Sequence, residues 1–177
     1  AFIAERDCAH VCGVSRDTPR LPIRRVAILG AGTMGGGIGI TMANAGYDVT
    51  MIETEEPALD AARARIRGLY DSQIARGRIA AETAEAAFAR FGWVVGLEEG
   101  VKGADLVIEA VYEDMGLKKK IFAALDTAAP DHAILASNTS YQNIDEMAAV
   151  TGRPDRVLGM HYFSPANIMR LLEVVRG

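Results

Sequence analysis

The residues Val26–Tyr47, VAILGAGTMGGGIGITMANAGY, decide the fold of this chain. Seven of the chain's 18 glycines fall within them, and none of these residues is charged. The apolar run Val26–Leu29 is typical of a short buried strand. Helical spacing begins only after the first glycines, over Thr33–Ala45, and Gly46 stands where a helix commonly ends. The stretch therefore predicts a strand, a tight turn and a helix in succession.

The same stretch is long enough to cross a bilayer, which takes about 20 apolar residues. Its glycines and the polar residues Thr33, Thr41 and Asn44 make it far less apolar than a spanning helix. The residues before it contain acids, bases and prolines and lack the apolar core of a signal peptide. We therefore expect no membrane span and a cytoplasmic location.

The overall composition is that of an ordinary globular protein: of 177 residues, 50% are hydrophobic and 24% are charged. The net charge of −4 at pH 7 is too mild and too acidic to indicate a nucleic-acid-binding protein. The two cysteines, Cys8 and Cys12, cannot form a disulfide framework, and their spacing is not that of the usual zinc or redox pairs. We expect no metal site.

From Arg25 onward the chain alternates strand-like and helical segments, the pattern of a parallel α/β sheet. Strands are expected at Val26–Leu29, Val49–Ile52, Trp93–Val95, Asp105–Ala110, Ala133–Ala136 and Arg156–Met160, with a last apolar run at Leu171–Val175. Besides Thr33–Ala45, helices are expected at Gly116–Ala128 and Asn143–Val150. Lys118, Lys119 and Lys120 are expected on exposed faces of the Gly116–Ala128 helix.

A helical hairpin is expected between the second and third strands. The residues from Thr54 to Gly92 show no strand signal, and a simple crossover needs only about a dozen residues. Pro57 suits the first position of a helix, and Gly77 interrupts the helical spacing. Apolar residues recur at helical intervals on both sides of Gly77: Leu59, Ala62, Ile66 and Leu69, then Ala84, Ala87, Phe88 and Phe91.

The turn after the first strand, Gly30-Ala31-Gly32-Thr33-Met34-Gly35, has the form G-x-G-x-x-G. In this context the first glycine allows a tight turn, the second lets a pyrophosphate approach the backbone, and the third lets helix and strand pack closely. Glu53, 23 residues after Gly30, ends the second strand, where an acid binds the adenosine ribose and repels a 2′-phosphate. The sequence thus predicts a dinucleotide site that prefers NAD over NADP.

Ligands of open α/β sheets bind beyond the carboxyl ends of the strands, which directs attention to residues 110–113 and 137–140. Asn138 and Ser140 could act in such a site or could merely shape the turn into the next helix. The sequence leaves both interpretations open.

Of the three histidines, His10 and His132 lie in polar segments and are expected to be solvated bystanders. His161 ends a strand, and Glu173 follows twelve residues later in another apolar run. If the two runs return past each other, the imidazole and the carboxylate could meet as a general base and the group that orients it. The alternative is an ordinary histidine at a strand end.

Four stretches together resemble the NAD-binding domain of 3-hydroxyacyl-CoA dehydrogenases: Val26–Glu53, Asp105–Lys118, Ala136–Ser140, and Gly159–Pro165 with Met169–Val174. The long hairpin after the second strand is also a feature of that family, where it helps to contact coenzyme A. The resemblance implies a Rossmann-type, doubly wound, mostly parallel sheet with an inserted helical hairpin.

The resemblance also implies roles for individual residues. Those implied to bind the cofactor are Gly30, Gly32, Met34, Gly35, Glu53, Glu113, Lys118, Ser140 and Ser164. Those implied to act in catalysis are His161 as the base, Glu173 as its carboxylate partner, and Ser140 at the substrate oxygen. One position departs from the common pattern of the family: Ser164 stands where many members have Asn, and serine there resembles the peroxisomal multifunctional subgroup. Glu53 stands where the family usually has Asp on the adenosine ribose.

The implied reaction is the NAD-dependent oxidation of L-3-hydroxyacyl-CoA to 3-ketoacyl-CoA in fatty-acid β-oxidation. Residues 1–23 resemble the linker helix that follows an enoyl-CoA hydratase half in multifunctional enzymes, which makes residues 24–177 the NAD-binding domain. The family's C-terminal α-helical domain, which closes the cleft and dimerises, would lie beyond Gly177. We therefore expect the isolated chain to bind NAD and to turn over poorly.

Two other functions are compatible with part of the pattern. One is a non-catalytic NAD-binding module that senses or stores the cofactor. The other is a related Rossmann dehydrogenase that acts on a different hydroxy acid. The second of these commonly uses a lysine base, so the His161…Glu173 motif argues against it.

Overall fold

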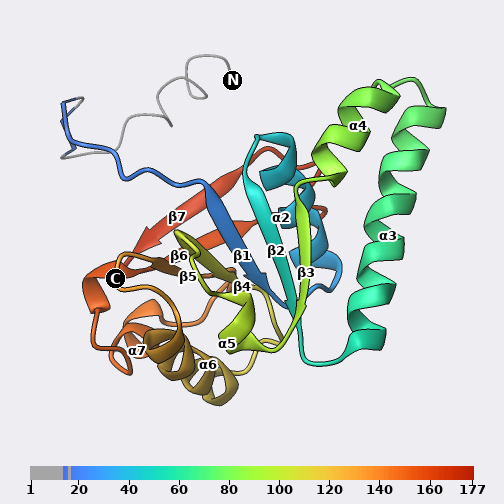
Figure 1. Ribbon diagram of the computed structural model, residues 1–177. Helices are drawn as coiled ribbons and strands as arrows, with labels where there is room; N and C mark the ends of the chain where they lie inside the picture. The colour runs from blue at the N-terminus through green and yellow to red at the C-terminus, as the bar shows by residue number, and fades with distance from the viewer. Residues whose placement is uncertain (1–13, 16) are drawn as a thin grey trace.

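The structure is a computed structural model that describes residues 14, 15 and 17–177 (Figure 1). Most of the segment that resembles a linker helix, with Cys8, Cys12 and His10, lies outside the described residues. Residues 17–24 contain no helix or strand and lead into the first strand at Arg25.

Seven strands form one sheet in the order β3-β2-β1-β4-β5-β6-β7. The strands are β1 (Arg25–Leu29), β2 (Asp48–Glu53), β3 (Phe91–Val95), β4 (Leu106–Glu109), β5 (Ile134–Ser137), β6 (Val157–Tyr162) and β7 (Leu172–Arg176). Neighbours are parallel except for the antiparallel pair β6–β7. The chain moves outward from β1 through β2 to β3 and returns to β4 on the other side of β1, so the sheet is doubly wound, as expected.

Helices cover both faces of this sheet (Figure 1). They are α2 (Thr33–Asn44), α3 (Glu56–Ala75), α4 (Ala81–Phe88), α5 (Leu97–Gly100), α6 (Met115–Ala128) and α7 (Ile144–Ala148), with a short 3₁₀ turn at Pro154–Arg156. Neither α5 nor the 3₁₀ turn was expected from the sequence. Among the described residues, no helix combines the length and the apolar character that crossing a membrane requires.

Two apolar cores, one on each face, follow from the alternation of side chains along the strands. Val26 and Ile28 of β1 belong to a core shared with α2, α3 and α4. Ala27 and Leu29, which point to the opposite face, belong to a core shared with α6 and α7. β1 is therefore buried on both faces, which is why its sequence is continuously apolar instead of alternating.

The glycines of α2 let this helix lie close to the sheet. A Cβ atom at Gly35 would lie 1.8 Å from the Gly30 carbonyl oxygen, and one at Gly39 would lie 2.9 Å from Sδ of Met51. These positions leave no room for a side chain. The dense glycines in the sequence thus reflect helix–strand contact as well as the turn itself.

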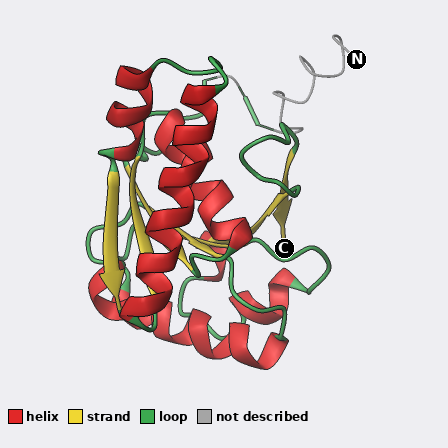
Figure 2. Ribbon diagram, turned by 90° about the vertical axis from the view of Figure 1, so that its right-hand side faces the viewer, coloured by secondary structure: helices red, strands yellow, loops and turns green. Residues whose placement is uncertain are grey.

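The expected helical hairpin is present as α3 and α4, between β2 and β3; α3 is the long helix facing the viewer in Figure 2. Arg67 of α3 pairs with Glu85 of α4, with 2.9 Å between Nη1 and Oε2. The expectation that Phe91 belongs to the second helix was wrong, because α4 ends at Phe88 and Phe91 begins β3. The rings of Phe88 and Phe91 belong to the same aromatic cluster, with 6.0 Å between their centroids. Their spacing of three residues in the sequence is the same as that of neighbours on one face of a helix.

The expectation that Lys118 is exposed on α6 was also wrong. Asp114 caps this helix by accepting a hydrogen bond from Leu117 N at 2.7 Å, and the side chain of Lys118 is only 1% exposed. Lys118 shares the buried face of α6 with Phe122 and Leu125, at i, i+4 and i+7. One lysine of the run, Lys118, therefore lies on the buried face of α6, where carboxylates neutralise its charge.

His132 is exposed, as its polar turn predicted, but it is not a bystander. Its Nε2 lies 3.2 Å from Oδ1 of Asp105, whose Oδ2 accepts hydrogen bonds from the backbone N–H groups of Arg24 and Arg25. Partial burial alone would raise the pKa of Asp105, but these hydrogen bonds hold it below its ordinary value. Asp105 thereby ties the start of β1 to the end of the turn before β5.

Candidate functional site

The glycine turn after β1 forms a backbone cradle at the N-terminus of α2. Gly30 has φ +91°, a conformation that L side chains rarely adopt, and its N–H donates to the Ile52 carbonyl at 3.0 Å. A Cβ at Gly32 would meet nothing within 4 Å, so the space beside this residue is open. Because α2 lacks a side-chain cap, its first N–H groups and positive dipole end suit a pyrophosphate.

Glu53 lies against this cradle. Its Oε1 accepts a hydrogen bond from Ala31 N at 2.7 Å, and Arg65 of α3 donates to the carbonyl of the same alanine. The carboxylate at the end of β2 is thus held beside the turn. This is the position from which an acid can reach ribose hydroxyls of a dinucleotide.

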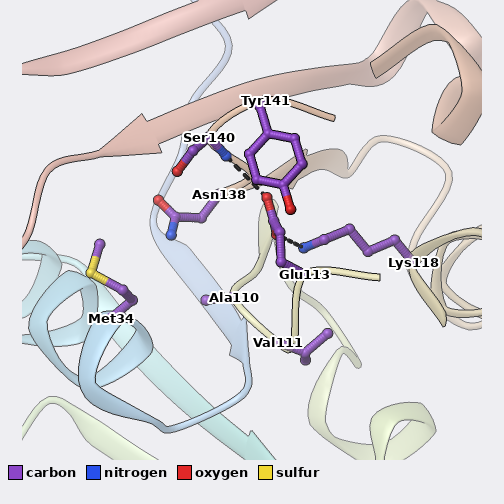
Figure 3. A pocket seen from close by; sticks show the side chains of 8 residues that line it. All are labelled: Met34, Ala110, Val111, Glu113, Lys118, Asn138, Ser140 and Tyr141. Atoms are coloured by element: carbon purple, nitrogen blue, oxygen red, sulfur yellow. Dashed lines mark hydrogen bonds and ion pairs between the residues drawn. The ribbon is translucent and has the colours of Figure 1, made fainter. Parts of the chain in front are cut away.

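A cavity of about 220 Å³ opens on the β4 side of β1 (Figure 3). It lies between the start of α2 and the segments that follow β4 and β5, at the point where the strand order reverses. In open α/β sheets this is where ligands bind. The lining residues are Met34, Ala110, Val111, Glu113, Lys118, Asn138, Ser140 and Tyr141.

A buried ionic cluster forms the floor of this cavity. The Lys118 ammonium lies 2.7 and 2.8 Å from the two carboxylate oxygens of Glu109, which is fully buried, and 3.0 Å from Oε2 of Glu113. Glu109 also accepts hydrogen bonds from Ser137 Oγ at 2.6 Å and from Val111 N at 2.8 Å. The three donor hydrogens of the ammonium are matched by three carboxylate oxygens.

Glu113 extends the cluster to the segment after β5. Its Oε1 accepts hydrogen bonds from Thr139 Oγ1 and, at 3.1 Å, from Ser140 N. Partial burial works to raise the pKa of Glu113, but these hydrogen bonds and the Lys118 ammonium hold it below its ordinary value. Glu113 is therefore ionised at neutral pH, with 29% of its side chain exposed.

His161 and Glu173 meet as the sequence suggested. They are directly opposed in the antiparallel pair β6–β7, and Nδ1 of His161 lies 2.8 Å from Oε2 of Glu173. This contact fixes the orientation of the imidazole and leaves Nε2 to act on a substrate. The site is thus a histidine–carboxylate pair on a rigid strand ribbon.

A second cavity, of about 180 Å³, joins this pair to the first one. Its lining residues are Thr139, Ser140, Tyr141, Gln142, Ile144, Gly159, His161, Glu173 and Val175. Ser140 and Tyr141 line both cavities. The structure therefore brings Met34, Glu113, Lys118 and Ser140 together and links them through Ser140 to His161 and Glu173.

Ser164 stands apart from this arrangement. It is exposed in the segment after β6 and lies outside the linings of both cavities, so its cofactor contact stays a prediction. Asn138 lines the first cavity, and its Oδ1 accepts a hydrogen bond from Tyr162 N, at the end of β6, at 2.9 Å. Its role in the site stays a prediction. Within the described residues, no group of three or more potential ligands is placed to hold a metal ion.

Sequence reasoning did not single out Glu109, although it is the centre of the buried cluster. The signal was present: Glu109 directly follows the apolar run Leu106–Ile108, and a carboxylate buried in a sheet requires a charge partner. Tyr141, whose side chain borders both cavities, was also missed.

Known proteins with similar sequences are dehydrogenases and multifunctional enzymes of fatty-acid β-oxidation. Residues 25–177 match the family model described as "3-hydroxyacyl-CoA dehydrogenase, NAD binding domain". The chain is 40% identical over 157 residues to a probable 3-hydroxybutyryl-CoA dehydrogenase of Bacillus subtilis, covering 89% of this chain and 54% of that protein. It is 38% identical over 177 residues to the peroxisomal fatty acid beta-oxidation multifunctional protein MFP2 of Arabidopsis thaliana, covering 99% of this chain and 24% of that protein.

Solved structures give the same result. The crystal structure of 3-hydroxybutyryl-CoA dehydrogenase from Escherichia coli superimposes with a TM-score of 0.84 at 38% identity, covering 87% of this chain and 32% of that one. The (S)-3-hydroxybutyryl-CoA dehydrogenase from Ralstonia eutropha gives a TM-score of 0.85 at 38% identity, covering 88% and 55%. The chain thus spans about half or less of the length of these relatives.

Proposed function

Because this chain belongs to the family of 3-hydroxyacyl-CoA dehydrogenase NAD-binding domains, we propose that it supplies the cofactor site and the catalytic base for oxidising L-3-hydroxyacyl-CoA to 3-ketoacyl-CoA. The observation that carries the proposal is the His161–Glu173 pair, which lines a cavity that shares Ser140 and Tyr141 with the cavity of the predicted cofactor site. A module that only stored or sensed NAD would have no use for a base oriented in this way.

The residues divide the chemistry between them. Bound NAD⁺ supplies the hydride acceptor for C3 of the substrate. His161 removes the proton of the 3-hydroxyl group through Nε2, while Glu173 holds Nδ1–H and stabilises the imidazolium that forms. Ser140, which faces both cavities, orients the substrate oxygen. The backbone of the glycine turn and Glu53 hold the adenosine and pyrophosphate portion.

The assignment of the individual cofactor contacts is also part of this proposal. The assignment of Gly30, Gly32, Met34, Gly35 and Glu53 is supported by the close packing at Gly30 and Gly35, the open space beside Gly32, the place of Met34 in the cavity lining, and the hydrogen bond from Ala31 N to Glu53. Glu113 reaches the cavity with part of its carboxylate, whereas Lys118 is saturated by carboxylates and acts on the cofactor mainly through them.

We further propose that residues 24–177 form one NAD-binding domain of a longer enzyme, with an α-helical C-terminal domain that closes the acyl-CoA cleft and forms a homodimer. An enoyl-CoA hydratase half in the same polypeptide is supported by the multifunctional and bifunctional relatives, of which this chain covers 24% and 21%. We propose the cytoplasm as the compartment, with the peroxisome as the alternative suggested by the names of those relatives.

Acetoacetyl-CoA reduction by NADH tests the activity. In the complete polypeptide that carries this sequence, we expect His161→Ala to lower kcat by about 10²- to 10⁴-fold and to leave the Kd for NADH unchanged within about twofold. The isolated chain should bind NADH and turn over slowly. Unchanged kcat in His161→Ala would favour the non-catalytic NAD-binding module instead.

A further inference from the structure

The ionic cluster on the floor of the first cavity carries an uneven charge. Glu109 and Lys118 carry opposite charges, so the pair has a net charge of zero. Glu113 adds one carboxylate without a cation of its own, because the three donor hydrogens of Lys118 are divided among three oxygens and two of these belong to Glu109. The cluster as a whole is therefore an anion of charge about −1.

This excess charge is directed toward the cavity. Glu109 and Lys118 are 0% and 1% exposed, whereas Glu113 is 29% exposed and lines the cavity wall (Figure 3). Asp114, next to Glu113, points to the first turn of α6, where its charge balances the positive end of that helix. Glu113 is thus the acidic group of the cluster that a bound molecule would meet.

The topology decides which part of a dinucleotide lies there. The glycine turn follows β1, in the middle of the arrangement, and binds the pyrophosphate. Glu53 ends β2, on one side of β1, and takes the adenosine end. The cavity with Glu113 lies on the opposite side of β1, next to β4. The nicotinamide end of the dinucleotide is therefore expected in this cavity.

We propose that Glu113 makes the site sensitive to the redox state of its cofactor, because its carboxylate lowers the Kd for NAD⁺, with its cationic nicotinamide, relative to the Kd for NADH, with its neutral dihydronicotinamide. The reason is electrostatic: the oxidised ring carries one positive charge, the reduced ring carries none, and the rest of the two molecules is identical. A fixed carboxylate in a partly water-excluded cavity stabilises only the former. This inference rests on NAD binding and not on the proposed oxidation, so the two can fail separately.

Binding of the two forms to the same preparation tests the proposal without any turnover. Kd for NADH is measured by its fluorescence and Kd for NAD⁺ by isothermal titration calorimetry, at neutral pH and constant ionic strength. The decisive quantity is the ratio Kd(NAD⁺)/Kd(NADH). We expect Glu113→Gln, which removes the charge but keeps the size, to raise this ratio about tenfold, as expected for the loss of one charge interaction through a screened site.

Three further variants test whether the charge of Glu113 causes the change in the ratio. Glu113→Asp keeps the charge, and its ratio should stay within about twofold of the original even if both affinities fall. Glu113→Ala also removes the charge, but it places no amide NH₂ group next to the Lys118 ammonium. It should raise the ratio as Glu113→Gln does. If Glu113→Gln does not fold, Glu113→Ala serves in its place. Glu146→Gln is the matched control, since Glu146 is also paired with a lysine, Lys119 at 2.6 Å, but on the surface.

The proposal is overturned if Glu113→Gln and Glu113→Ala weaken NAD⁺ and NADH by the same factor, because Glu113 would then contribute contact and not charge. It is also overturned if Glu113→Asp shifts the ratio as far as Glu113→Gln, or if Glu146→Gln shifts it equally. A rise confined to the two neutral variants supports it.

Discussion

Nδ1 of His161 and Oε2 of Glu173 lie 2.8 Å apart because their Cα atoms face each other in the register of β6 and β7. The pair stands on the one antiparallel edge of the described sheet. Directly opposed residues in an antiparallel pair place their side chains on the same face within contact distance. The same face carries Gly159 and Val175, which continue the wall of the second cavity.

Replacing Glu173 by Gln should separate orientation from charge. The amide can still accept from Nδ1–H but cannot stabilise the imidazolium, so kcat should fall about 100-fold while Kd for NADH stays the same. Stopped-flow reduction of acetoacetyl-CoA by the complete polypeptide measures the first quantity, and fluorescence titration measures the second. Unchanged kcat would show that His161 acts without its carboxylate.

Two glycines of the turn should fail in different ways when changed to Ala. At Gly35 the new methyl group would lie 1.8 Å from the Gly30 carbonyl oxygen, so helix α2 must move and stability should fall by about 2 kcal/mol or more. At Gly32 the methyl group meets nothing within 4 Å, so Tm should hardly change, but the methyl group should occupy pyrophosphate space and weaken NADH at least about tenfold. Urea unfolding and NADH titration of both variants separate the two effects. Equal loss of stability in both would contradict the contrast.

Much of this fold was predictable because its signals are local. The turn Gly30–Gly35, the strand before it and Glu53 after the next strand are close in sequence, and each part constrains the next. The hairpin was predictable from the lack of any strand signal over a long stretch. Its end was not, because Phe91 contacts the aromatic cluster from a strand at the spacing of a helix.

The charged part of the site depends on tertiary contacts that the sequence does not display. Glu109 and Lys118 belong to different elements, and only packing of α6 against the sheet turns a lysine run into one buried and two more exposed residues. Ser164 is the opposite case: the resemblance implied that it contacts the cofactor, but in the structure it is exposed and lies outside the linings of both cavities.

Lys118 should matter for stability far more than its neighbour Lys119. Lys118→Met leaves the buried carboxylate of Glu109 without its cation and should cost about 3–5 kcal/mol. Lys119 pairs with Glu146 at the surface, and Lys119→Met should change stability by about 1 kcal/mol or less. Urea unfolding of both variants provides the comparison. If Lys118→Met lost as little stability as Lys119→Met, the ionic cluster would not be what holds together the two segments that line the cavity.

Asp126 should give a stability contribution that depends on pH. Its Oδ2 accepts from Gly152 N at 2.8 Å and its Oδ1 from Arg153 Nε at 2.9 Å; Arg153 also donates to the Pro130 carbonyl at 2.6 Å, just beyond α6. The backbone N–H of Gly152 and the Arg153 guanidinium lower the pKa of Asp126 from its ordinary 3.8.

A carboxyl group with a lower pKa in the folded than in the unfolded state stabilises the fold above its unfolded pKa and loses this contribution as the pH falls through its folded pKa. Asp126→Asn should therefore be less stable than the original by about 1 kcal/mol at neutral pH, and the gap should close at pH values well below 3.8. Urea unfolding at both pH values measures it, with Asp60→Asn, exposed on α3, as the control. A gap of equal size at both pH values would mean that hydrogen-bond geometry, and not the charge of Asp126, ties the end of α6 to the segment before β6.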